Sequence, residues 1–156
     1  MEGVELVEEQ GGAIEAARGL ILNNLVAFNA SVAPPLEWTP FAITARDVDG
    51  VVVGGATGQS QWRWLFLSHL WVSEARRGQG LGSQLIADVE NLARRRECVG
   101  VHLDTFSFQA EPFYLGLGYT RFGVLDDYPP GFQRYYLEKR LAWGPRAPGG
   151  ATGTSD

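Results

Sequence analysis

Cysteine, histidine and long apolar runs are all scarce in this chain of 156 residues. Cys98 is its one cysteine, so no intrachain disulfide can form. The two histidines, His69 and His102, are far apart in the sequence, which supplies a metal site poorly. No stretch approaches the roughly 20 apolar residues that a membrane helix needs, and the acidic start "MEGVELVEEQ" does not resemble a signal peptide. We therefore expect a cytoplasmic protein without a membrane partner or a bound metal.

Positive charge is also in deficit. The chain has 13 basic and 18 acidic residues, which give a formal net charge of −5. Binding to nucleic acid needs a basic surface that neutralises phosphates, so no nucleic-acid partner is expected. The negative balance suits a cationic substrate, although solubility alone explains it equally well.

The length and the even composition predict one domain over residues 1–142, followed by a disordered tail over 143–156 that is rich in Gly, Pro and Ala. Residues 2–9 alternate enough to suggest a short edge strand. Over residues 12–31, apolar side chains recur at helical spacing at Ile14, Ile21, Leu25 and Phe28.

The rest of the chain alternates between strand and helix patterns. Two strands flank the turn at Asp49-Gly50, and the nearly continuous apolar run 62–73 fits a buried central strand. The elements expected next are a helix to about residue 97, a strand at 100–106, a short helix at 109–118 and strands at 119–125 and 132–141. The fold class is therefore α/β or α+β, with a mixed, mostly antiparallel sheet of about six to seven strands flanked by helices.

A glycine-rich stretch, "ARRGQGLGSQLI", opens the helix after the central strand. Its glycines let the backbone approach a ligand, and the first N–H groups of a helix favour an anion. Arg76 and Arg77 add charge, and Ser83 adds a hydroxyl. The stretch lacks the Gly-Lys-Ser/Thr of a Walker loop and the third glycine of a dinucleotide fingerprint. It is either a phosphate-binding loop or a simple tight turn.

Two motifs carry a family resemblance. Arg77-Gly78-Gln79-Gly80-Leu81-Gly82 resembles the Arg/Gln-x-x-Gly-x-Gly/Ala signature of the GNAT superfamily of N-acetyltransferases. About 30 residues later, the segment 110–119, "AEPFYLGLGY", resembles that family's Ala-x-x-Phe-Tyr-x-x-x-Gly-Phe motif. The resemblance covers roughly residues 40–141. It implies a GNAT-like fold with splayed central strands and acetyl-CoA as co-substrate. Dimers are common in that family and usually form through the last strand, so a homodimer is one oligomeric state that the resemblance allows.

The resemblance also implies which residues bind acetyl-CoA. The pyrophosphate would lie on the motif at residues 77–82, which we call the glycine loop. The pantetheine arm would pair with the strand at Leu70-Trp71-Val72. Ser107 stands where the family often has an asparagine that touches this arm, so that contact would be shorter or lost. The residues expected to bind the co-substrate are Leu70, Trp71, Val72, Arg77, Gly78, Gln79, Gly80, Leu81, Gly82, Ser83, Ser107 and Phe113.

Acetyl transfer to an amine needs a neutral amine, a stabilised carbonyl oxygen and a proton for the leaving thiolate. The resemblance assigns the proton to Tyr114, and a backbone N–H of the strand at Leu70–Val72 would meet the oxyanion. His69 and Asp104 are candidates for the base. Asp104 could instead hold a cationic substrate or cap a turn, and Glu37, Glu74 and Glu111 are further acidic alternatives.

The acceptor is less defined. Trp38, with Glu37 beside it, could wall a substrate pocket, or its ring could simply fold onto the domain. Segments such as "LDTFSFQAEPFY" resemble a bacterial branch with kasugamycin-type aminoglycoside N-acetyltransferases. A cationic aminoglycoside-like acceptor is therefore favoured. The alternatives are a protein, peptide or polyamine acetyltransferase and a non-catalytic acetyl-CoA-binding module.

Overall fold

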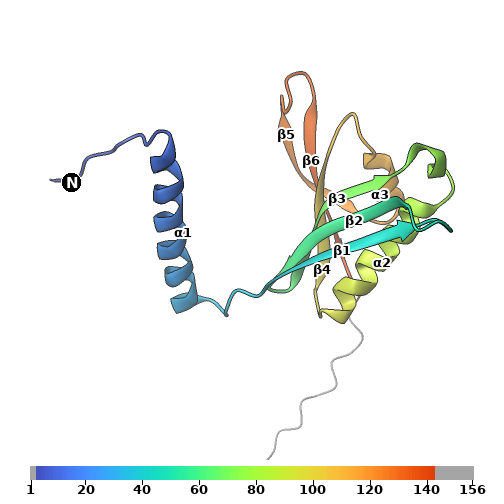
Figure 1. The fold of residues 1–156 in the computed structure, drawn as a ribbon, viewed down its shortest axis with the longest axis horizontal. Coiled ribbons are helices and arrows are strands. Elements are labelled where there is room, and N and C mark those ends of the chain that lie inside the picture. Colours follow the sequence, from blue (N-terminus) through green and yellow to red (C-terminus); the bar gives the residue numbers. More distant parts are fainter. Residues whose placement is uncertain (1–2, 143–156) are drawn as a thin grey trace, which may run out of the picture. The chain divides into compact units, whose positions relative to one another are not determined.

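The structure is a computed structural model that describes residues 3–142 and divides into two compact units, residues 3–36 and 37–142. The expected tail at 143–156 lies outside the described residues. Figure 1 shows the elements of each unit. Among residues 3–142, no helix combines the length and the apolar character that crossing a membrane requires.

The first unit contains one helix, α1 (Gly12–Val32), which confirms the expectation for residues 12–31. It ends where the Ala33 N–H donates to the Asn29 carbonyl oxygen (2.8 Å), just before Pro34 and Pro35. The edge strand expected at 2–9 is wrong, since its described residues, 3–9, form no strand. Alternating apolar residues make a strand only where another strand is available to pair with them.

The second unit is a six-stranded mixed sheet, as the sequence predicts. Its strands lie in the order β1-β2-β3-β4-β6-β5, and β3 and β4 are the parallel neighbours. The bounds are β1 Trp38–Arg46, β2 Val52–Gln61, β3 Trp64–Val72, β4 Gly100–Phe106, β5 Thr120–Asp126 and β6 Gln133–Arg140. Between them lie a short 3₁₀ turn, η1 (Glu74–Arg76), and two helices, α2 (Leu81–Arg95) and α3 (Glu111–Gly116).

The core of this unit lies between α2 and one face of the sheet. Leu85, Ile86, Val89 and Ala93 of α2 are buried at helical spacing. Ile86, Val89 and Ala93 share a cluster with Leu65 and Leu67 of β3, Val101 and Leu103 of β4 and Leu137 of β6. Tyr114 of α3 joins the same cluster, so α3 packs on the same side of the sheet as α2. The paired parts of β3 and β4 are therefore held by a closely packed layer on this face.

Arg96 fixes the C-terminal end of α2. Its guanidinium donates to the carbonyl oxygens of Thr39 (2.7 Å) and Pro40 (3.0 Å) and to the Ser60 hydroxyl (3.0 Å). These acceptors lie at the start of β1 and the end of β2. The helix is thereby tied to the sheet by charge-assisted hydrogen bonds as well as by its apolar face.

A bulge bends β3. Gly58 of β2 faces Leu67, while the preceding Thr57 faces His69, so Ser68 is the extra residue of β3. The Ser68 hydroxyl donates to the Thr57 carbonyl oxygen (2.9 Å). A β-bulge of this kind turns the strand and increases its twist. Residue 58 must be glycine here, because a Cβ would collide with the Phe66 carbonyl oxygen and press on the Phe41 ring.

Replacing Gly58 with alanine tests this requirement. We expect G58A to lower the free energy of unfolding by more than about 2 kcal/mol, since the backbone of β2 and β3 must separate to admit the methyl group. Urea unfolding measures the loss. The control is Gly19→Ala in α1, where a Cβ meets nothing within 4 Å and alanine favours the helix. A G58A protein as stable as G19A would contradict the close approach at the bulge.

Candidate active site

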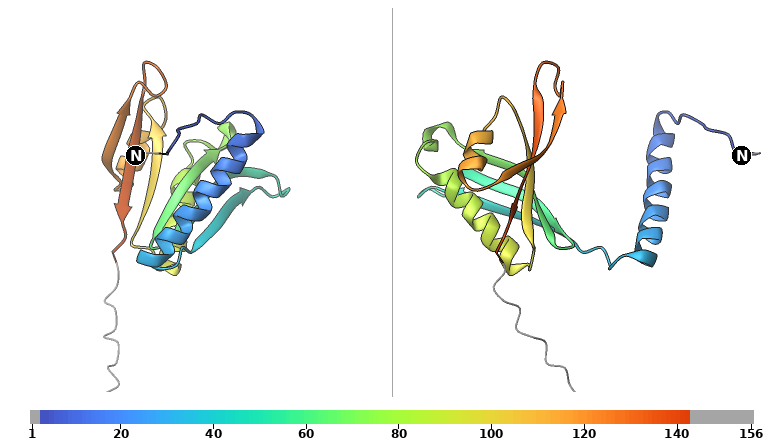
Figure 2. Two further views of the ribbon diagram at one scale, coloured as in Figure 1. Left: turned by 90° about the vertical axis from the view of Figure 1, so that its left-hand side faces the viewer. Right: turned by 180° about the vertical axis from the view of Figure 1, so that it is seen from behind.

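The two central strands separate halfway along their length. β3 and β4 pair from Trp64–Gly100 to Leu67–Leu103, and beyond this point their described residues do not pair with each other. The bulge at Ser68 falls at the same place. Both views of Figure 2 show β1–β3 and β4–β6 diverging as two groups. A cleft of about 960 Å³ opens there, lined by the ends of both strands, the glycine loop and α3.

The separation leaves one edge of β3 facing the cleft. Leu70, Trp71 and Val72 pair with Ala56, Gly55 and Gly54 of β2 on their other side. Because strand residues carry main-chain donors and acceptors on both edges, the edge toward the cleft can pair with an extended ligand. All three residues line the cleft, as do His69 and Ser68.

The glycine loop and the first turn of α2 close one end of the cleft. Gly78 (φ +71°) and Gly80 (φ +83°) adopt left-handed backbone conformations, which glycine reaches without strain. No described side chain caps the start of α2, and its first turn carries no acidic residue. Uncapped N–H groups and the positive end of the helix dipole thus point toward the cleft, and they favour an anion with several oxygens.

Two polar side chains of the loop bind main-chain carbonyl oxygens just before it. The Arg77 Nε donates to the Val72 carbonyl oxygen (3.2 Å), and the Gln79 Nε2 donates to the Ala75 carbonyl oxygen (2.8 Å). Arg77 lines the cleft, as do Arg76, Leu81, Gly82 and Ser83, whereas Gln79 is not among its lining residues. Gln79 therefore shapes the loop here, and two arginines supply positive charge to the anion end.

Helix α3 brings Tyr114 to the cleft. The Tyr114 ring packs edge-to-face with those of Phe113 (5.1 Å between centroids) and Tyr119 (5.9 Å). Phe113 in turn packs close to Gly82 at the start of α2. Burial raises the pKa of the Tyr114 hydroxyl to about 12. The hydroxyl stays protonated throughout the neutral range, so it can donate a proton but not act as a base.

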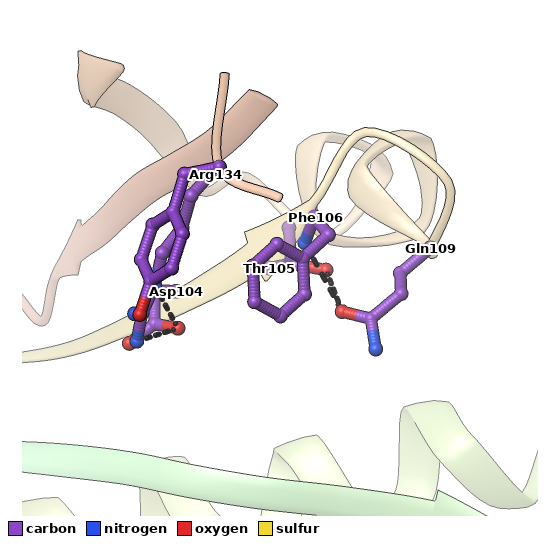
Figure 3. Close-up of polar contacts among 6 residues, drawn as sticks. Asp104, Thr105, Phe106, Gln109 and Arg134 are labelled. Carbon is purple, nitrogen blue, oxygen red and sulfur yellow. Dashed lines mark hydrogen bonds and ion pairs between the residues drawn. The ribbon is translucent and has the colours of Figure 1, made fainter. Parts of the chain in front are cut away.

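Asp104 lies on β4 just after the last residue that pairs with β3, and it lines the cleft. Arg134 of β6 binds its carboxylate (Figure 3). The Nε and a terminal nitrogen of Arg134 lie 2.8 and 2.6 Å from the same oxygen, Asp104 Oδ1. Arg134 also donates to the Tyr128 hydroxyl (3.2 Å). The pair fixes the position of the carboxylate and offsets its charge. This arrangement suits a group that orients a substrate amine through its second oxygen.

Gln109 holds the loop between β4 and α3. Its Oε1 accepts from the Thr105 hydroxyl (3.1 Å) and from the Phe106 N–H (3.0 Å), as Figure 3 shows. Gln109, Thr105 and Phe108 all line the cleft. These contacts tie Gln109, which lies just before α3, to the end of β4. They therefore help to position α3 and its Tyr114.

Several predicted site residues do not line the cleft. Glu37 immediately precedes β1, and Trp38 pairs with Gln61, at the end of the sheet away from the splay. Ser107 binds the β5–β6 hairpin, with its hydroxyl accepting from the Gln133 N–H (3.1 Å). Among the acidic alternatives, Glu111 forms an ion pair with Arg121, and Glu74 is an exposed residue of η1.

His69 remains at the cleft. It is exposed, and its Nδ1 lies 3.2 Å from the Thr57 hydroxyl oxygen. His102 lies on β4, stacked on Phe66 (4.9 Å), and burial lowers its pKa, which keeps it neutral at neutral pH. His69 is thus the histidine that the structure brings together with Tyr114, Asp104 and the glycine loop.

Sequence reasoning missed other lining residues, among them Ser68, Phe108 and Gln109. Ser68 stands out only once the bulge is known, since it lies in a nearly continuous apolar run that reads as one strand. Phe108 and Gln109 could have been found, because they lie between the end of a predicted strand and the "AEPFY" motif. Loops at strand ends commonly carry site residues.

Together these groups offer three functions in one cleft. One end can hold a multiply charged anion, the β3 edge can pair with an extended chain, and Tyr114 can donate a proton. Acceptor-side groups, Asp104 and His69, lie where the strands separate. The arrangement fits an elongated ligand with a phosphate at one end and a reactive group beside Tyr114.

Comparison with known proteins identifies relatives of this chain. A sequence model of the "Acetyltransferase (GNAT) family" matches residues 24–119. A blasticidin-S acetyltransferase from Streptomyces morookaense is 44% identical over 112 residues, which cover 70% of this chain and 79% of that protein. An acetyltransferase from Agrobacterium fabrum is 36% identical over 80% of this chain and 91% of its own length.

A solved structure shows the same fold. The crystal structure of an acetyltransferase from Bacillus cereus superimposes with a TM-score of 0.78 and is 35% identical. The match covers 87% of this chain and 98% of that one.

The role of the glycine loop is tested by Gly80→Val. A β-branched residue at φ +83° is strained by about 1–3 kcal/mol, and relief of the strain would turn the first N–H groups of α2 away. We expect G80V to weaken CoA binding by at least about tenfold, measured by calorimetry. Gly50→Val is the matched control, because Gly50 has φ +81° but lies in the β1–β2 turn. Equal losses of affinity in both variants would refute a local role for the loop.

Proposed function

The chain belongs to the GNAT family of acetyltransferases, and on this premise we propose that it acetylates a primary amine of a small, cationic molecule. The observation that carries the proposal is the convergence of the glycine loop, the β3 edge, Tyr114 and Asp104 on one cleft. The acetyl donor is acetyl-CoA, the co-substrate of this family.

The described residues fit this donor along the cleft. Its pyrophosphate would be held by the N–H groups at the start of α2, with Arg76 and Arg77 adding charge. Its pantetheine arm would pair with the β3 edge at Leu70–Val72, which directs the thioester toward Tyr114. Acetyl-CoA supplies an activated acyl group, and the protein has to position it and manage protons.

The proposed chemistry is direct attack in a ternary complex. The neutral amine nitrogen attacks the thioester carbonyl carbon, the C–S bond breaks, and the amine gives up a proton. A backbone N–H of β3 stabilises the carbonyl oxygen as it gains charge. Tyr114 gives its proton to the leaving thiolate and regains a proton from water once CoA has left.

Asp104 and His69 divide the acceptor-side roles in this proposal. Arg134 holds Asp104 through Oδ1, so Oδ2 can bind the ammonium form of the acceptor and orient it. His69 is exposed at the cleft and can take the proton that the amine must lose, directly or through water.

The proposed acceptor class is an antibiotic-like amine. Support comes from the relative named for blasticidin-S, at 44% identity over 70% of this chain, and from the net charge of −5. Aminoglycosides, the class favoured by the sequence, belong to the same cationic group. Polyamines and the amines of proteins or peptides are the alternative acceptors. A purely binding role is disfavoured because Tyr114, the proposed proton donor, lines the cleft.

A cytoplasmic location and a dimer remain predictions. Cys98 is a free and buried thiol whose pKa is raised by burial. Such an unreactive thiol is compatible with a reducing compartment. The dimer prediction rests on the family resemblance and on the aromatic residues of the last strand.

The role of Tyr114 is tested by Tyr114→Phe. Loss of the proton donor should lower kcat by about 100-fold or more, with CoA affinity unchanged, because the hydroxyl would act on the leaving thiolate. Steady-state kinetics and calorimetry measure the two quantities. Tyr135→Phe is the control, since that buried tyrosine donates to Gln133 and does not line the cleft. Full activity in Y114F would remove Tyr114 as the acid.

The acceptor class is tested by measuring the release of free CoA thiol from acetyl-CoA with a panel of amines. The panel contains blasticidin S, nourseothricin, kasugamycin, other aminoglycosides, polyamines, amino acids and a lysine peptide. We expect turnover with a cationic antibiotic to exceed that with the peptide by at least about tenfold in kcat/KM. Preference for the peptide would overturn the proposed acceptor while leaving the acetyltransferase intact.

A further inference from the structure

Four aromatic side chains gather beside the acceptor side of the cleft. Phe106 ends β4, Phe108 lies in the loop that follows, and Tyr128 and Phe132 lie in the β5–β6 hairpin. The rings of Phe106 and Phe108 stack in parallel, with centroids 5.2 Å apart and planes 2° apart. Phe106 and Tyr128 meet edge-to-face at 6.0 Å, and Phe108 and Phe132 do so at 5.0 Å. We call these four residues the aromatic shelf.

The aromatic shelf is more exposed than a core cluster. The exposed fractions of Phe108, Tyr128 and Phe132 are 54%, 47% and 45%. Phe108 also lines the cleft, as do Gln109 and Asp104. The shelf is therefore continuous with the place where an acceptor would enter.

Main-chain contacts hold the shelf in place. The Tyr128 N–H donates to the Phe132 carbonyl oxygen (3.0 Å). Ser107 joins the loop to the hairpin, since its N–H donates to the Gln133 carbonyl oxygen (2.8 Å) and its hydroxyl accepts from the Gln133 N–H (3.1 Å). Two segments far apart in the sequence are thereby fixed side by side. This lowers the entropic cost of ordering the protein when a ligand binds.

The charge around the shelf favours a cation. Arg134 lies over the Phe106 and Tyr128 rings, 5.5 and 5.2 Å from their centroids, and its charge is balanced by Asp104. Asp126 and Asp127 in the hairpin are exposed, and their carboxylates accept from Gln133 and from the Gly131 N–H. The surface therefore combines aromatic rings with carboxylates, which suits a planar group attached to an amine.

We propose that the aromatic shelf is an acceptor subsite that binds a planar, heteroaromatic ring by stacking on Phe108, while the amine of the same molecule reaches Asp104. This inference rests on the proposed function and narrows its substrate class. Acceptors would carry a flat ring in the same molecule as their primary amine, and a purely saturated aminosugar would use the shelf poorly.

The experiment compares two ligands that differ in ring planarity. The probes are 5′-amino-5′-deoxyuridine and its 5,6-dihydro derivative, which carry the same amine and the same sugar. Calorimetry measures their affinity for the protein saturated with CoA. We expect the planar probe to bind about tenfold more tightly, and Phe108→Leu to reduce this preference below about threefold. Phe108→Trp should preserve it.

Phe122→Leu is the matched control, because Phe122 is 59% exposed on β5 and contacts Tyr136 outside the shelf. It should retain the full preference, and CoA affinity should be equal in all variants. Should Phe108→Leu fold poorly, Phe132→Leu takes its place. Three results would refute the shelf as an acceptor subsite. They are equal affinity for the two probes, no binding of either, and an unchanged preference in Phe108→Leu. Failure of the proposed function is a different result, namely no CoA binding or no acetylation of any amine.

Discussion

The cleft exists because β3 and β4 stop pairing after Leu67 and Leu103. A parallel pair that continued to the ends of both strands would fill this space with main-chain hydrogen bonds. The bulge at Ser68 turns β3 away, and Gly58 lets β2 follow the turn. That separation gives β3 an edge that faces the cleft. It also lets the glycine loop and Asp104 line the same cleft.

The packed layer under the splay gives the open strands their rigidity. Leu65, Leu67, Val101 and Leu103 are buried where the strands still pair, against α2. Above them, some main-chain groups lack the internal hydrogen-bond partners that would stabilise the protein further. The first N–H groups of α2, which no described side chain caps, are an example. Native proteins commonly break local rules at functional sites and compensate elsewhere in the fold. Here the compensation is a continuous apolar core directly below the cleft.

The sequence predicted most elements and the glycine loop, because both leave local signals. Helical spacing marked α1 and α2, and Gly78 and Gly80 marked the left-handed turn before α2. The alternation at residues 2–9 misled, since alternation alone supplies no partner strand. The Asp104–Arg134 pair and the aromatic shelf could not be predicted, because they join residues from separate segments. Their proximity follows from the β4–β6 register, which brings Phe106 opposite Arg134.

The anchoring of Arg96 has a mechanical consequence for the cleft. Helix α2 has 15 residues, so it is a rod of roughly 22 Å between Arg96 and the glycine loop. Arg96 is bound to the main chain of β1 at the far end of that rod. A small change of tilt there becomes a larger displacement of the N–H groups at the other end. The position of the first turn of α2 is therefore governed partly by the three hydrogen bonds of Arg96, which lie a whole helix away from it.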